Sequence, residues 1–172
     1  MDYVSQLSTS TQKTPVGPFT SIADDDVVVA SGWTADASRL LRYLHPSLRN
    51  KHESQLHRYN DLGEISRAVT EYHNGDITAP DRIPVGLGGS QFHVTAWRAL
   101  RTVPAGTTMS YGRYAALMGK PNAVRAAASV CARNPVALFV PCHRVIRSDG
   151  SIGGFGYGVE LKVWLLDLER DA

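Results

Sequence analysis

The residues best suited to chemistry lie in the last third of the chain, where a cysteine and a histidine are adjacent. Cys142 follows an apolar run at 136–140, typical of a buried strand, and Pro141, which ends the strand ladder and directs the cysteine outward. A thiol becomes nucleophilic when a base or a positive charge favours the thiolate, and His143 and two arginines follow within five residues. This pattern predicts a nucleophilic cysteine. The alternative is a packed core cysteine beside a structural histidine.

Cysteine and histidine usage argues against metal sites and disulfides. Two cysteines occur in the 172 residues, Cys131 and Cys142, and neither belongs to a CxxC pair. The six histidines are scattered, so no ligand spacing emerges and the sequence predicts no metal site. We expect a reduced, intracellular and specifically cytoplasmic setting. No apolar stretch approaches the roughly 18 residues of a membrane helix, and the first ten residues do not resemble a signal peptide.

Positive charge is concentrated in one region of the chain. Residues 82–148 contain no acidic residue, whereas all sixteen acidic residues lie outside this window. Such segregation favours a polyanionic partner such as DNA. The alternative is that the acidic first half packs beside the window and neutralises it. The nine cations of the window are Arg82, Arg98, Arg101, Arg113, Lys120, Arg125, Arg133, Arg144 and Arg147.

Two short helices are expected within this window, at 111–118 and 122–132, joined by a tight turn that contains Gly119. This pattern indicates a helix-turn-helix, with the second helix reading DNA. Arg125 projects a long cationic group from its start, and the small side chains would let its backbone approach a groove closely. The alternative is an alanine-rich helix packed tightly against a neighbour. The small residues are Ala123, Ala126, Ala127, Ala128 and Ser129.

The remaining elements divide the chain into two expected domains. After a polar leader, β-branched runs at 19–23 and 27–33 predict a hairpin. We expect an α/β domain at 1–82, a linker at 83–89 and a mainly α domain with the helix-turn-helix at 90–172. Residues 46–59 are expected to be irregular, and 150–158 to form a glycine-rich loop.

Further helices are predicted from apolar spacing, at 35–44, 61–73, from Ser90 to the break at Pro104, and at about 159–170. Asp61 is expected to cap the second of these with Glu64 as its capping-box partner, and Ser90 to cap the third. A short strand is expected near 83–87.

The run from Gln91 to Glu169 resembles the catalytic domain of the O6-alkylguanine-DNA alkyltransferases (methylated-DNA–protein-cysteine methyltransferases). The first half resembles this family more loosely, through residues 14–19 and the two short strands, which implies a small sheet of the ribonuclease H-like type. The matching pieces stand in the family's order: Phe92, Val94, Trp97 and Leu100; Ser110-Tyr111; the run Asn122 to Ala126; Asn134-Pro135; the run Pro141 to Ile146; and Leu168-Glu169.

The resemblance implies a single-turnover alkyl transfer from damaged guanine. Cys142 would be the nucleophile, and His143 the base, acting through a water. Glu169 would hold and polarise that imidazole, in the manner of a triad. Asn134 would be the hinge between the reading helix and the active-site strand. No cofactor is implied, because the damaged base is itself the alkyl donor.

The resemblance also implies binding of double-stranded DNA that carries O6-alkylguanine, in the minor groove and with the target base flipped out. Arg125 would fill the space left by the base. Tyr111 would rotate the target phosphate and supply a proton to the leaving guanine. Val145 and Gly156 would bind the flipped base through their backbones, and Phe155 would form part of the pocket wall.

Three features depart from the family pattern. Ala128 stands where the family usually has glycine, which adds a methyl group where backbone approaches DNA and predicts lower affinity. Phe155 stands where some members have tyrosine, and the glycines of 153–158 predict a mobile pocket lid that admits groups larger than methyl. No cysteine precedes Cys131, so the structural zinc of some relatives is not expected.

Two other functions stay open from the sequence. A non-catalytic sensor of alkylguanine would recruit other repair factors, but relatives of that kind lack the cysteine, commonly having tryptophan where Cys142 stands. A Cys–His hydrolase would need an oxyanion hole and turnover, and it would leave the acid-free window unexplained. The alkyltransferase reading requires no membrane and no protein partner, and it allows cooperative self-association on DNA.

Overall fold

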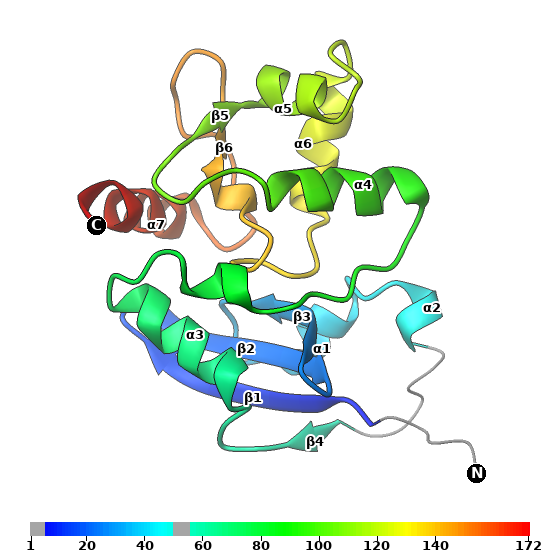
Figure 1. Cartoon of the computed structure of the whole chain (residues 1–172), viewed down its shortest axis with the longest axis vertical. Helices are drawn as coiled ribbons and strands as arrows, with labels where there is room; N and C mark the ends of the chain where they lie inside the picture. The colour runs from blue at the N-terminus through cyan, green and yellow to red at the C-terminus, as the bar shows by residue number, and fades with distance from the viewer. Residues whose placement is uncertain (1–5, 50–55) are drawn as a thin grey trace. The chain divides into compact units, whose positions relative to one another are not determined.

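The computed structural model describes residues 6–49 and 56–172, which form two compact units (Figure 1). The first unit holds the described residues up to Gly89 together with Pro135–Phe139, and the second holds Ser90–Asn134 and Val140–Ala172. All of 90–172 was expected to form one domain. Pro135–Phe139 instead pack with the first unit, because they are buried and hydrogen-bond to Ser31 of its sheet.

The first unit contains a four-stranded mixed sheet in the order β3-β2-β1-β4. Strands β1 (Ser8–Thr14), β2 (Gly17–Asp24) and β3 (Val27–Gly32) are antiparallel neighbours, and the short β4 (His57–Arg58) runs parallel to β1. The expected hairpin is confirmed as β2–β3. The polar leader was misjudged, because β1 consists almost entirely of polar residues and carries no apolar signal.

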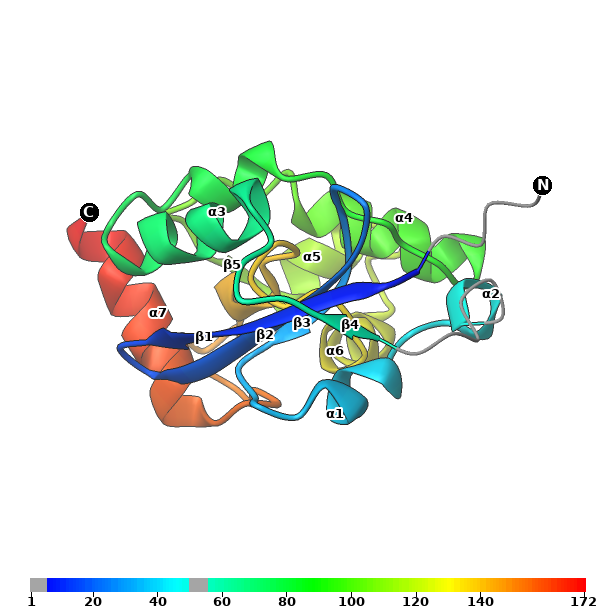
Figure 2. The same cartoon turned by 90° about the horizontal axis from the view of Figure 1, so that it is seen from below.

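Helices cover both faces of this sheet. Helix α3 (Glu64–His73) and helix α1 (Ala37–Leu41) lie on opposite sides of the strands (Figure 2), and α2 (Pro46–Arg49) and the 3-10 turn η1 (Ala79–Arg82) complete the unit. On the α3 face, the ring of Phe19 stacks edge-on against His73, 6.2 Å away. On the α1 face, Ile22 and Leu40 belong to one buried apolar cluster. Alternation along β2 therefore supplies a core to each face.

Four local predictions for this unit need correction. Residues 46–59 were expected to be irregular but contain the helix α2 and the strand β4. Asp61 does not cap α3: Gly63 occupies the N-cap with φ 65°, and Asp61 accepts a hydrogen bond from the Gly63 amide instead. The strand expected near 83–87 is reduced to a bridge between Val28 and Val85. The strand expected at 136–140 is buried but does not extend, because Leu138 takes a left-handed conformation with φ 77°.

The second unit is mainly helical, as expected. Ser90 caps α4 by accepting from the His93 amide, and the hydroxyl of Tyr114 and the indole of Trp97 hydrogen-bond to carbonyls of neighbouring helices. A small parallel pair, β5–β6, was not anticipated. Among the described residues, no helix is long and apolar enough to cross a membrane. The elements in chain order are α4 (Gln91–Leu100), β5 (Met109–Ser110), α5 (Tyr111–Leu117), α6 (Val124–Ala132), η2 (Cys142–Arg144), β6 (Val145–Ile146) and α7 (Val159–Asp171).

Candidate active site

Cys142 begins the 3-10 turn η2 and is buried, with 8% of its surface exposed. Its amide donates to the carbonyl of Val140 at 2.9 Å. The side-chain amide of Asn134 donates to that same carbonyl at 2.8 Å and to Sγ of Cys142 at 3.1 Å. Asn134 comes immediately after Arg133, the C-cap of α6, so one side chain connects the end of that helix to the cysteine.

The environment of Cys142 favours the neutral thiol. Burial raises the pKa of this thiol, and this effect outweighs the hydrogen bond from Asn134 and the positive charge of Lys162, which both lower it. A neutral thiol is a poor nucleophile. The site therefore needs a base to take the proton as the sulfur reacts.

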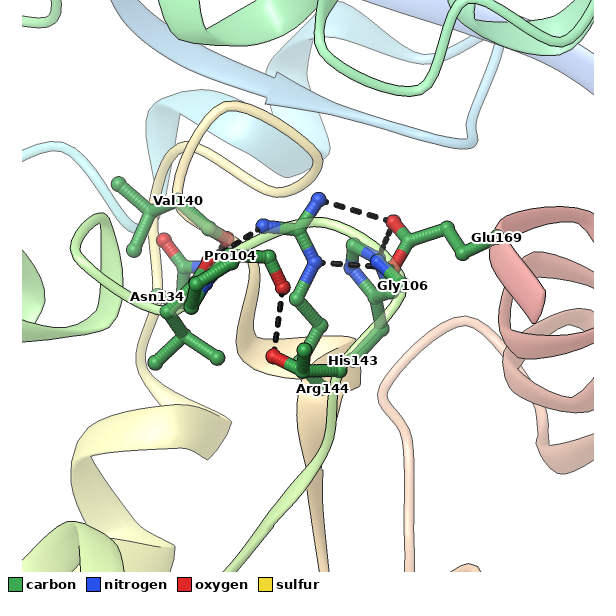
Figure 3. Close-up of polar contacts among 9 residues, drawn as sticks. Pro104, Gly106, Asn134, Val140, His143, Arg144 and Glu169 are labelled. Carbon is green, nitrogen blue, oxygen red and sulfur yellow. Dashed lines mark hydrogen bonds and ion pairs between the residues drawn. The ribbon is translucent and has the colours of Figure 1, made fainter. Parts of the chain in front are cut away.

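His143 and Glu169 form a buried pair beside this cysteine. Nε2 of His143 lies 2.7 Å from Oε1 of Glu169, and both side chains are almost completely inaccessible (Figure 3). Burial lowers the pKa of His143. Glu169 raises this pKa through its hydrogen bond and its negative charge, but the effect of burial is larger. Burial alone would raise the pKa of Glu169, but His143 and Arg144 outweigh it and hold that pKa well below its usual range. A neutral imidazole on an ionised carboxylate is a competent base.

The arginines near Cys142 do not act on it as expected. Arg144 is buried and directs its guanidinium at Glu169, with Nε 2.9 Å from Oε2, while Arg147 is exposed. The positive charge that stabilises the thiolate comes from Lys162 instead.

Lys162 is a residue of the site that was not predicted from the sequence. This side chain is 1% exposed, and its Nζ donates to the carbonyls of Val145 at 2.7 Å and Gly154 at 3.2 Å. Burial lowers the pKa of its ammonium group. The signal was present in the helical spacing of α7, because Lys162, Leu165 and Glu169 occupy one buried face at i, i+3 and i+7.

Tyr111 and the glycine-rich loop border the same site. Tyr111 is the first residue of α5, and the Nζ of Lys162 lies 6.0 Å from the centre of its ring. Burial, and then the nearby Cys131 and Cys142, raise the pKa of Tyr111 to about 12, so its hydroxyl stays protonated near neutral pH.

The three residues assigned to the base pocket differ in exposure. Val145 is fully buried and its carbonyl binds Lys162. Phe155 is partly buried and stacks edge-on against Tyr157, 5.8 Å away, and Gly156 is exposed. Among the residues that the structure describes, no group of three or more His, Cys, Asp or Glu side chains could hold a metal ion.

Helix α6 presents most, but not all, of the residues assigned to DNA binding. Arg125 and Ala128 are exposed, and Ala123 and Ala126 are partly exposed. Ala127 is completely buried, which corrects its assignment. Helical geometry explains the difference, because Ala127 shares the inward face with Val130, three residues on.

Comparison with known proteins places this site in context. Residues 91–171 match the family described as "6-O-methylguanine DNA methyltransferase, DNA binding domain". A Shigella flexneri protein named methylated-DNA–protein-cysteine methyltransferase is 35% identical over 154 residues, covering 89% of this chain and 90% of the relative. The chain belongs to the methylated-DNA–protein-cysteine methyltransferase family. A relative of the same name from Mycobacterium bovis is 36% identical over 159 residues, covering 91% and 88%.

Solved structures of this family share the fold. The crystal structure of Mycobacterium tuberculosis OGT in complex with DNA superposes with a TM-score of 0.78 at 29% identity, covering 95% of this chain and 93% of that one. The structure of the M. tuberculosis O6-methylguanine methyltransferase gives 0.75 at 28% identity, covering 96% and 94%. A mixed sheet accompanied by helices is thus the family's architecture, as expected from the sequence.

Proposed function

We propose that this protein repairs O6-alkylguanine in double-stranded DNA by direct reversal, moving the alkyl group irreversibly to its own Cys142. The observation that carries the proposal is a buried thiol that accepts a hydrogen bond from Asn134 and lies on the same turn as His143, whose ring is paired with the buried Glu169 of α7. Membership of the methylated-DNA–protein-cysteine methyltransferase family supports it. A lesion sensor would have no use for the thiol at this position.

The transfer is a substitution at the alkyl carbon. His143 takes the thiol proton through a water, and Sγ of Cys142 bonds to the carbon as the bond from carbon to the guanine oxygen breaks. Tyr111 donates a proton to the departing guanine, and the proton taken up by His143 then returns to the Tyr111 oxygen, so both side chains end neutral. Glu169 stabilises the imidazolium that forms in the meantime. The product is a thioether that no side chain here can hydrolyse, so each molecule acts once and needs no cofactor.

We assign the helices α5 and α6 to a helix-turn-helix whose second helix enters the minor groove. The exposed Arg125 would fill the stack after the base flips outward, a motion the chemistry requires because a stacked guanine oxygen cannot meet a buried thiol. The small side chains of Ala123, Ala126 and Ala128 would let the helix backbone approach the groove.

The flipped guanine would be held by Val145, Phe155 and Gly156.

We also assign the sheet of the first unit to the ribonuclease H-like type, from its antiparallel β1–β3 and parallel β4. We place the protein in the cytoplasm, where its two free cysteines would remain reduced.

The test is the intact mass of the protein after incubation with a duplex that contains one O6-methylguanine. We expect a gain of one methyl group, located on Cys142 by peptide mapping, that stops at one per protein molecule. The matched control is Cys142→Ser, which should gain nothing. Tight binding of the lesion duplex without any gain in mass would instead identify a sensor, and turnover of simple esters would identify a hydrolase.

A further inference from the structure

Arg144 makes a two-pronged contact with Glu169, and the steps of the alkyl transfer described above assign no role to it. Its Nε lies 2.9 Å from Oε2 and its Nη2 lies 2.9 Å from Oε1. Oε1 is also the oxygen that contacts Nε2 of His143 at 2.7 Å. Figure 3 shows the carboxylate of Glu169 reaching from α7 to both side chains. The guanidinium therefore sets the plane in which the carboxylate meets the imidazole.

We propose that Arg144 is a positioning residue of the transfer reaction, which fixes Glu169 so that Oε1 accepts the Nε2–H of His143. The inference rests on the proposed role of His143 as base. A planar guanidinium matches a carboxylate through two parallel hydrogen bonds, whereas an ammonium is a point charge that leaves the carboxylate free to rotate. With Nε2 bonded to Glu169, Nδ1 is the nitrogen left to accept the proton.

The Arg144–Glu169 pair also contacts a third segment of the chain, the loop after α4. Nη1 of Arg144 donates to the carbonyl of Val103 at 2.8 Å, and the amide of Gly106 donates to Oε2 of Glu169 at 3.3 Å. Both contacts fall in the loop after α4, which leads into β5 and then to Tyr111. Glu169 is thus held by the turn that carries the base and by the loop that precedes the proposed proton donor.

Arg144 also balances the charge around His143. The charged groups that act on this imidazole are Glu169 and Lys162 from α7 and Arg144 from η2. The cation of Arg144 lowers the pKa of His143 and so opposes Glu169, which raises it. Removing the cation would leave the carboxylate uncompensated and raise the pKa of His143, so the base would be protonated, and inactive, over a wider range of acidic pH.

Two substitutions separate geometry from charge. Arg144→Lys keeps the positive charge but loses the planar fork, and Arg144→Met keeps side-chain bulk but loses the charge. The matched control is Arg170→Met, which removes the neighbouring arginine of Glu169 on α7, an exposed side chain paired with Asp167 and Asp171. The single-turnover rate of methyl transfer from an O6-methylguanine duplex is measured from about pH 6 to 9, with circular dichroism to verify folding and 15N NMR of His143 to report its tautomer.

We expect Arg144→Lys to slow transfer on the order of 100-fold at every pH, because a misplaced reacting group costs about that much. Its His143 should show a mixture of tautomers, where wild type and Arg170→Met show only the Nε2–H form. We expect Arg144→Met to slow transfer further and to move the acidic limb of the profile to higher pH.

The proposal is overturned if Arg144→Lys transfers at the wild-type rate with the wild-type tautomer. It is equally overturned if folded Arg144→Met loses the same factor at every pH while its His143 keeps the wild-type Nε2–H tautomer, since a purely structural loss does that. Should Arg144→Met fail to fold, the rate and tautomer of Arg144→Lys decide the matter. Failure of the wild-type protein to accept a methyl group would count against the proposed function, not against the role of Arg144, which the tautomer reports independently.

Discussion

The side-chain amide of Asn134 lies 3.1 Å from Sγ of Cys142 and donates a hydrogen bond to it, while the same nitrogen binds the carbonyl of Val140. One amide thus both shapes the backbone that presents the cysteine and stabilises negative charge on its sulfur. The second effect can be measured without DNA.

Replacing Asn134 with alanine should make the thiol of Cys142 less acidic. The hydrogen bond from Asn134 lowers the thiol pKa against the larger effect of burial, so its loss should raise that pKa further. The pH dependence of alkylation by iodoacetamide checks this, and its midpoint should move to higher pH. The fold should also lose about 1–3 kcal/mol of stability, because the buried carbonyl of Val140 loses a donor.

The exposed Asn122, at the start of the turn into α6, provides the control. Asn122→Ala should leave both the alkylation midpoint and the free energy of unfolding close to wild type. An unchanged midpoint in Asn134→Ala would mean that the amide serves only the backbone.

Glu169 should contribute to stability in a pH-dependent way. Its folded pKa is depressed well below the ordinary value of 4.5, so its contribution is fully present above 4.5 and is lost progressively as the pH falls from there through the folded pKa. We expect Glu169→Gln to lower the free energy of unfolding by about 3–5 kcal/mol near pH 7. In urea titrations the gap between the two proteins should narrow as the pH falls below about 4.5, and it should close only in strongly acidic solution, well below the usual carboxyl range.

Glu160, in the first turn of α7 and exposed, offers the comparison within the same helix. Glu160→Gln should change stability by less than about 0.5 kcal/mol. A gap for Glu169→Gln that stays constant with pH would show that its carboxylate is not held ionised by His143 and Arg144.

Ser31 should stabilise the first unit through one hydroxyl. Its Oγ donates to the carbonyl of Ala137 at 2.7 Å, and both residues are buried. Ser31→Ala leaves that carbonyl with one partner fewer, so we expect a loss of about 1–3 kcal/mol in the free energy of unfolding. Thermal or urea unfolding measures it.

The sheet supplies a matched control, since Ser21 pairs directly with Ser31 across β2 and β3. The buried hydroxyl of Ser21 has no hydrogen-bond partner among the described residues. Ser21→Ala should therefore keep stability unchanged or raise it by about 1 kcal/mol. Equal losses in the free energy of unfolding at both positions would mean that the hydrogen bond from Ser31 to Ala137 does not stabilise the fold.

Arg125 should matter for DNA and not for the chemistry. Because its side chain is exposed on α6, away from the buried thiol, Arg125→Ala should weaken binding to the lesion duplex by about 1–3 kcal/mol. Reaction with free O6-benzylguanine base should proceed at the wild-type rate. Arg67→Ala, which removes an exposed cation of α3 paired with Glu64, should alter neither measurement. A slower reaction with the free base would place Arg125 in the reactive site instead.

The sequence predicted the residues of the site better than the contacts that arrange them. Cys142 and His143 are adjacent, so their proximity needed no fold, and Glu169 was assigned through family resemblance alone. Lys162 was not predicted because it donates hydrogen bonds to backbone carbonyls, and every residue type has a backbone carbonyl, so the sequence does not indicate these contacts. The position of Arg144 two residues after Cys142 indicates a cation that promotes the thiolate, and nothing in the chain order shows that α7 brings Glu169 to it.

The same distinction applies to the fold: elements with a clear pattern of residue types were predicted, and elements without one were not. Helices with apolar faces, such as α4, were located from their spacing and caps, whereas β1 was missed because its side chains are polar on both faces. The two-residue strands β5 and β6 are too short for any periodicity to register. The run at 136–140 has the composition of a strand, and only the backbone conformation of Leu138 prevents it from extending.

The excursion of Pro135–Phe139 into the first unit has a consequence for how such a chain can be divided or recombined. The backbone passes between the units three times, after Gly89, after Asn134 and after Phe139. Severing it once, between residues 89 and 90, would therefore release no self-contained half. The fragment that begins at residue 90 would carry the five apolar residues Pro135–Phe139 without the first-unit residues that bury them. These five residues lie between Asn134 and Cys142, which are both part of the reactive site. Neither unit can therefore be separated from the other as an intact domain by a single cut in the chain.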